Sequence, residues 1–135
     1  MQRQLLIALM LSASQLSYAD SKDLRQKEHA CGEYSSYRQI AGCFSQLFEE
    51  TDAELNSQYK QLVEYLDPKN RKRLVVAQRA WVKFRDADCA FVEPREDDGG
   101  LVTSDRKICQ YRITVQRLEQ IESFNLTRGC NGCPW

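Results

Sequence analysis

The stretch 77–89, AQRAWVKFRDADC, constrains the fold most, because it combines helical apolar spacing with interior-looking polar residues and a cysteine at its end. Apolar residues that recur at steps of three and four are typical of an amphipathic helix. Those near one face of this helix are Leu74, Ala77, Trp81, Phe84 and Val92. Polar residues fall on or beside the same face, where burial is expected; they are Gln78, Arg85 and Asp88.

Three explanations of these polar residues stay open. The apolar face rotates along the helix, the polar groups pair with one another and with the preceding helix, or they line a functional site. An unpaired buried polar group costs about 1–3 kcal/mol, which favours pairing. We therefore predict a structural polar network made of Asn56, Tyr59, Gln78, Arg85 and Asp88.

The preceding segment, from Phe44 to Leu66, has the same periodicity and predicts a first long helix. Thr51 and Glu54 have the spacing of a capping box, so this helix either runs unbroken or restarts at Thr51. A shorter helix is predicted between Cys31 and Cys43, where apolar residues also recur at three- and four-residue steps.

The second long helix is predicted to begin at Asp67-Pro68, an N-cap followed by a residue that a first helical turn tolerates. Residues 94–103, PREDDGGLVT, are rich in turn formers and predict an exposed loop. Ser104 has N-cap character, and helical spacing then continues to Phe124 as a third long helix. The fold class is therefore all-α: a small antiparallel bundle of three long helices plus a short N-terminal helix.

The N-terminal region carries an export signal. Arg3, an apolar run from Leu5 to Leu11 and small residues at Ser17 and Ala19 predict a signal peptide over residues 1–19. The run is too short to span a bilayer, which needs about 20 apolar residues, so no transmembrane segment is expected. Asp20, not a cysteine, follows the cleavage point, which argues against a lipid anchor. We expect a periplasmic or secreted protein.

The mature chain divides into two parts. Residues 20–30, DSKDLRQKEHA, have few large apolar residues and predict a mobile N-terminal segment. Residues 31–135 have the length of a single α-helical domain.

Export places the cysteines in an oxidising compartment, and pairing of neighbours in sequence predicts three disulfides. The pairs are Cys31 with Cys43, Cys89 with Cys109, and Cys130 with Cys133.

Charge and composition argue against several functions. Removing Arg3 with the signal leaves 18 Lys and Arg against 19 Asp and Glu, a net charge of −1, which argues against a nucleic-acid partner. His29 is the only histidine and lies in the mobile segment, so no catalytic residue is assigned. One C-x-x-C pair, Cys130 and Cys133, offers two ligands where closed zinc sites use four, so neither a metal nor a cofactor is expected.

Three elements in order, DAELNSQY at 52–59, AQRAWVKFRDADC at 77–89, and Cys109 followed by a helix with Thr114 and Arg117, resemble the secreted bacterial family named after the LprI lysozyme inhibitor. The resemblance runs from about Cys31 to Leu118 and makes residues 31–135 an LprI-like domain. It implies an α-helical, extracytoplasmic, non-enzymatic protein whose partner is a protein, namely a lysozyme. The alternative is a periplasmic binding or scaffolding domain with another partner.

The loop between the second and third long helices is the predicted partner-binding region; the alternative is a charged loop that is only solvated surface. Its acidic residues suit attraction to a basic lysozyme, whereas its basic and hydroxyl groups suit the two catalytic carboxylates of a lysozyme cleft. The residues are Glu93, Arg95, Glu96, Asp97, Asp98, Thr103, Ser104, Arg106 and Lys107.

Overall fold

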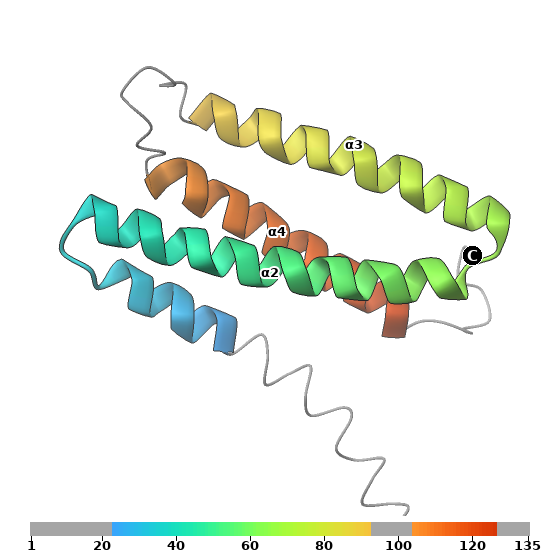
Figure 1. Ribbon diagram of the computed structural model, residues 1–135, viewed down its shortest axis with the longest axis horizontal. Helices are drawn as coiled ribbons and strands as arrows, with labels where there is room; N and C mark the ends of the chain where they lie inside the picture. The colour runs from blue at the N-terminus through green and yellow to red at the C-terminus, as the bar shows by residue number, and fades with distance from the viewer. Residues whose placement is uncertain (1–22, 93–103, 127–135) are drawn as a thin grey trace, which may run out of the picture.

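The computed structural model describes residues 23–92 and 104–126, and every regular element in them is a helix. A short N-terminal helix spans residues 23–32, followed by α2 (Tyr37–Tyr65), α3 (Pro68–Val92) and α4 (Ser104–Leu126). Successive helices run in opposite directions, so α2 and α4 point the same way (Figure 1). The all-α fold predicted from the sequence, three long helices plus a short N-terminal one, is confirmed.

Helix α2 is one continuous helix. Ser36 caps its start, and the Oγ of Ser36 accepts a hydrogen bond from the backbone N–H of Gln39 at 3.3 Å. Thr51 is 1 % exposed, and its hydroxyl donates to the carbonyl of Leu47 one turn earlier at 2.7 Å. A hydroxyl that donates to the carbonyl of the preceding turn already has its hydrogen bond within the helix, so it does not act as an N-cap. Of the two alternatives left open by the sequence, the unbroken helix is therefore the one found.

The N-terminal helix corrects two predictions. Residues 23–30 are helical, although residues 20–30 were predicted to be mobile, and residues 20–22 lie outside the described part. Leu24 packs against the core, and Tyr111 of α4 donates a hydrogen bond to the Leu24 carbonyl at 3.3 Å. Docking on α4 thus supplies the stabilisation that the local sequence lacks. The short helix also lies before the turn at 33–36, not between Cys31 and Cys43.

The junction of α2 and α3 is held by two residues. The Asp67 carboxylate accepts hydrogen bonds from the backbone N–H groups of Lys69 at 2.9 Å and Asn70 at 3.1 Å, as predicted for an N-cap. These bonds, that from Asn70 above all, lower the pKa of Asp67. Arg71 donates to the carbonyls of Val63 and Leu66, the free acceptors at the end of α2. The chain therefore reverses direction over very few residues.

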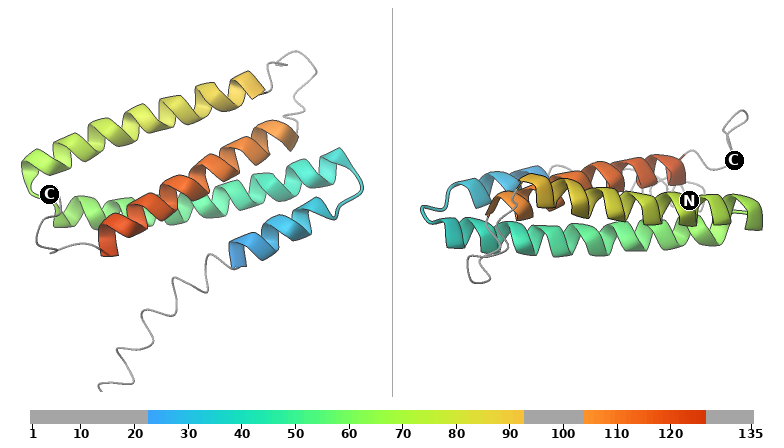
Figure 2. Two further views of the ribbon diagram at one scale, coloured as in Figure 1. Left: turned by 180° about the vertical axis from the view of Figure 1, so that it is seen from behind. Right: turned by 90° about the horizontal axis from the view of Figure 1, so that it is seen from above.

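The core lies mainly between α2 and α4, the most closely packed pair of helices. One buried cluster joins the C-terminal half of α2 to that of α4 and contains Leu55, Leu62, Leu66, Leu118 and Ile121. The other joins Phe44 and Leu47 to Cys31 and Tyr111, with the rings of Phe44 and Tyr111 centred 5.7 Å apart. Helix α3 packs on α4 at one edge of the bundle (Figures 1 and 2).

Helix α3 faces the core with only part of the face predicted from the sequence. Its buried residues are Gln78, Arg85 and Cys89, whereas Leu74 and Trp81 are half-buried. Phe84, assigned to the buried face from the sequence, is exposed, and so are Ala77 and Val92. The polar face turns inward because Gln78 and Arg85 find partners on the other helices. Two of the three explanations therefore hold in part: the apolar face rotates along the helix, and the polar groups pair with other helices.

Two disulfides lie in the described residues, and both match the predicted pairing. Cys31 is joined to Cys43 and Cys89 to Cys109, each with a Cα–Cα distance of 5.5 Å. Cys130 and Cys133 lie outside the described residues. Within residues 23–92 and 104–126, no helix is long and apolar enough to cross a bilayer.

Burial of Tyr111 leads to a testable pH dependence. Loss of hydration raises the pKa of the Tyr111 phenol to about 12. The unfolded chain then releases this proton near pH 10 while the folded chain keeps it, so stability is lost as the pH rises from 10 towards 12. A shift of this size corresponds to about 2–3 kcal/mol. We expect the free energy of unfolding of the wild type, relative to Tyr111→Phe, to fall by this amount between pH 10 and 12 in urea titrations. A difference that stays constant with pH would contradict this role of burial.

Candidate functional site

The predicted partner-binding loop joins the end of α3 to the start of α4. Glu93, Arg95, Glu96, Asp97, Asp98 and Thr103 lie outside the described residues, but both ends of the loop are described. Cys89 lies in the last turn of α3 and is buried, and it is joined to Cys109 in the second turn of α4. The disulfide therefore joins the end of α3 to the start of α4.

The first turns of α4 hold the remaining loop candidates. Ser104 begins the helix, and Arg106 and Lys107 are both half-buried. The Lys107 ammonium lies 5.1 Å from the centre of the Phe48 ring on α2, a distance at which a cation and an aromatic ring attract each other. Lys107 is thus engaged with the bundle itself, which leaves Arg106 as the more available cation of this turn.

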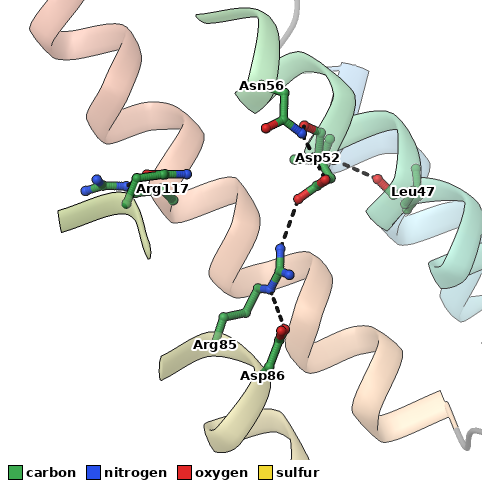
Figure 3. A network of polar contacts seen from close by, with 8 residues as sticks. Leu47, Asp52, Asn56, Arg85, Asp86 and Arg117 are labelled. Carbon is green, nitrogen blue, oxygen red and sulfur yellow. Dashed lines mark hydrogen bonds and ion pairs between the residues drawn. The ribbon is translucent and has the colours of Figure 1, made fainter. Parts of the chain in front are cut away.

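Arg85 connects α3 to α2. Its guanidinium donates to the carboxylate of Asp52 at 2.9 Å and to that of Asp86 at 3.0 Å (Figure 3). The same group lies 5.1 Å from the ring centres of both Phe48 and Trp81. A planar guanidinium suits this position because it stacks on rings with its faces while its edge donates hydrogen bonds. Arg85 therefore acts as a buried link between the two helices.

A second buried arginine, Arg117, connects α4 to α3. It is 9 % exposed and donates to the side-chain oxygen of Gln78 at 2.9 Å, and also to that of Gln120. Its guanidinium lies 5.8 Å from the centre of the Trp81 ring. Burial lowers the pKa of Arg117, and the nearby Tyr59 acts in the opposite direction. The two arginines thus flank Trp81 and place α3 against the rest of the bundle.

The predicted polar network is only partly assembled. Gln78 and Arg85 lie in the interior, and Tyr59 is half-buried near Arg117. Asn56 is exposed but joins the network, because it donates to the Asp52 carboxylate that Arg85 also contacts, whereas Asp88 is exposed. The prediction missed Asp52 and Arg117, the partners of Arg85 and Gln78 on the other helices.

One signal would have pointed to Arg117. It lies at three- and four-residue steps from Thr114 and Ile121, both 0 % exposed, so it shares the buried face of α4. Asp52 carries no comparable signal, because its carboxylate is only half-buried and its partner is far away in the sequence.

These contacts describe a structural cluster. Both arginines are bound by side chains of neighbouring helices, and their guanidinium groups stack on rings. In the part of the chain that the structure describes, no three His, Cys, Asp or Glu side chains gather as metal ligands would. What this cluster does is hold α3, and with it one end of the loop, at a fixed place. The candidate site is therefore the loop and the first turn of α4.

Comparison with known proteins agrees with the sequence elements described above. No curated protein and no solved structure matches the chain. A family model described as "Lysozyme inhibitor LprI" matches residues 29–121. This range includes both described disulfides, the whole loop between α3 and α4, and the two buried arginines. The chain therefore belongs to the LprI lysozyme inhibitor family.

Proposed function

We propose that this protein is exported, binds a lysozyme and inhibits it by covering the cleft with residues 93–107. The observation that carries the proposal is the family match over residues 29–121. The bundle supports it, because a disulfide at the base of the loop and two buried arginines restrict the loop's ends. Restricting a binding loop before contact lowers the entropy lost on binding.

The acidic residues of the loop and its basic and hydroxyl residues have different roles in this proposal. Acidic side chains at Glu93, Glu96, Asp97 and Asp98 attract a basic lysozyme during approach, an effect expressed mainly in the association rate. The cleft itself carries two carboxylates, which repel acids and accept hydrogen bonds from cations and hydroxyls. Arg95, Arg106, Thr103 and Ser104 are the proposed contacts there; Lys107 contributes less because it packs on Phe48.

The proposal is tested by a turbidity assay of cell-wall lysis, with the mature chain titrated against several types of lysozyme. We expect inhibition that saturates with dose for at least one type at micromolar concentration or below. Full lysis by every type at micromolar concentration would reject inhibition. The binding or scaffolding alternative would then be the better account of the fold.

Reversing two loop charges gives a sharper expectation. The variant Asp97→Lys with Asp98→Lys should associate with a lysozyme about tenfold more slowly at low salt, with a weaker dependence on salt, because steering depends on charge. Surface plasmon resonance measures both quantities.

The matched control reverses two exposed acids on the helices, Glu49→Lys with Glu119→Lys, and leaves the loop intact. It has the same net charge as the loop variant. Equal slowing by both variants would show that only net charge matters and would remove the loop from the proposal.

A further inference from the structure

Helix α3 carries an apolar stripe on its outward side. The stripe consists of Val76, Ala77, Ala80, Phe84, Ala87 and Phe91, all of them exposed. The two phenylalanines are 58 % and 83 % exposed, and Val76 is 62 % exposed. Steps of three and four residues place these side chains on one face, away from the buried Gln78, Arg85 and Cys89. Helix α3 lies at an edge of the bundle (Figures 1 and 2), which agrees with the exposure of all six side chains.

The same helix is strongly basic. It holds seven Lys and Arg against two Asp, a net charge of +5, and its first turn contains no acid. Arg71 and Arg85 are turned toward the bundle, where they donate to other helices and turns. The other five cations, Lys69, Lys72, Arg73, Arg79 and Lys83, are exposed. Their spacing places them at the N-terminal end of the apolar stripe and along one border of it.

An exposed stripe of this kind needs an anionic partner with an apolar layer. A second copy of the chain would bring the same +5 helix and be repelled, and a basic lysozyme would be repelled as well. Helices that lie in a membrane surface combine an apolar face containing phenylalanine with Lys and Arg along its border. Anionic headgroups attract such cations.

We propose that α3 docks this protein on the surface of an anionic phospholipid bilayer. The helix lies parallel to the membrane, with Phe84 and Phe91 inserted among the headgroups and the five cations facing phosphate groups. The lysozyme-binding loop follows α3 in the chain, so docking would concentrate the inhibitor at the membrane. This proposal rests on α3 alone and does not depend on the inhibition of a lysozyme.

Vesicle flotation tests the proposal with the mature chain, residues 20–135. Vesicles of phosphatidylglycerol mixed with phosphatidylethanolamine should carry the protein upward at low salt, whereas phosphatidylcholine vesicles should not. Binding should weaken as salt is raised, because headgroup attraction is screened. Absence of binding to the anionic vesicles at low salt would overturn the proposal.

Two variants separate the apolar contribution from the charge. Phe84→Ser with Phe91→Ser, and separately Lys72→Glu with Arg73→Glu, should each weaken vesicle binding by about tenfold or more. These side chains are exposed, so helicity measured by circular dichroism should be unchanged. The controls are Tyr37→Ser and Lys60→Glu, an exposed aromatic residue and an exposed cation on α2, and they should bind vesicles like the wild type.

Other outcomes would overturn the proposal in distinguishable ways. Loss of binding in the charge variant alone would indicate a polyanion site without bilayer insertion. Self-association that the phenylalanine variant abolishes, in a protein that ignores vesicles, would assign the stripe to a second copy. Inhibition of a lysozyme by the phenylalanine variant should remain at the wild-type level in solution, so failure of membrane docking and failure of inhibition are separate results.

Discussion

Replacing Cys89 and Cys109 together by serine should lower the free energy of unfolding by about 3 kcal/mol. The disulfide spans 20 residues of sequence, and its removal returns conformational entropy to the unfolded chain. If the proposed function holds, it should also weaken inhibition of a lysozyme, because the ends of the proposed binding loop are then no longer covalently joined. Urea unfolding measures the first effect, and the turbidity assay measures the second.

The other described disulfide provides a control with nearly the same stability cost. Cys31 and Cys43 are 12 residues apart, so their replacement by serine should also cost about 3 kcal/mol in the chain-entropy model. That pair does not bridge the ends of the loop, so its replacement should weaken inhibition less, although Cys31 and Cys43 pack near Ile108 at the start of α4. Equal loss of inhibition in both double variants would show that general stability, not the loop base, governs activity.

Removing the Arg85 side chain should cost about 3 kcal/mol, the second large effect. Arg85→Ala leaves Asp52 without its cation and opens a space between the rings of Phe48 and Trp81. Arg85→Lys should recover only part of the lost free energy of unfolding. An ammonium group is not planar, so it cannot stack between two rings and also donate hydrogen bonds from its edge to a carboxylate. Urea unfolding of the three proteins provides the comparison.

Asp86→Ala is the matched control, because it removes the other carboxylate that Arg85 contacts. The Asp86 side chain is 50 % exposed, so this ion pair is largely screened by solvent and its loss should cost less than about 1 kcal/mol. A cost below about 1 kcal/mol for Arg85→Ala itself would contradict the view that Arg85 fixes α3 against α2.

Local sequence signals were sufficient for the starts of α3 and α4 but not for the start of α2, which is Tyr37 and not Phe44. The N-cap at Asp67, the start of α4 at Ser104 and the two nearest-neighbour disulfides all depend on residues close together in the chain. They could be predicted because capping and loop closure are local properties. The same reasoning failed for residues 23–30, whose helix is held by Leu24 and Tyr111, 87 residues apart.

The orientation of α3 could not be predicted for a related reason. Periodicity identified an amphipathic helix, but hydrophobicity alone placed Phe84 inside, together with Trp81. The structure exposes Phe84, while Gln78 and Arg85 are buried as predicted, with Arg117 and Asp52 on other helices as their partners. Partners that are distant in sequence leave no periodic signal, so the exposed stripe on α3 emerges only from the structure. The binding loop, inferred from charge and turn residues, stays a prediction.

Competition for the lysozyme cleft tests the central claim most directly. The mature chain is bound to an immobilised lysozyme, and an oligosaccharide that fills the cleft is then titrated against the complex. If residues 93–107 cover the cleft, the oligosaccharide should displace the protein. The oligosaccharide concentration that displaces half of the bound protein should rise in proportion to the concentration of the protein. Binding that is unaffected by a saturating oligosaccharide would contradict the claim.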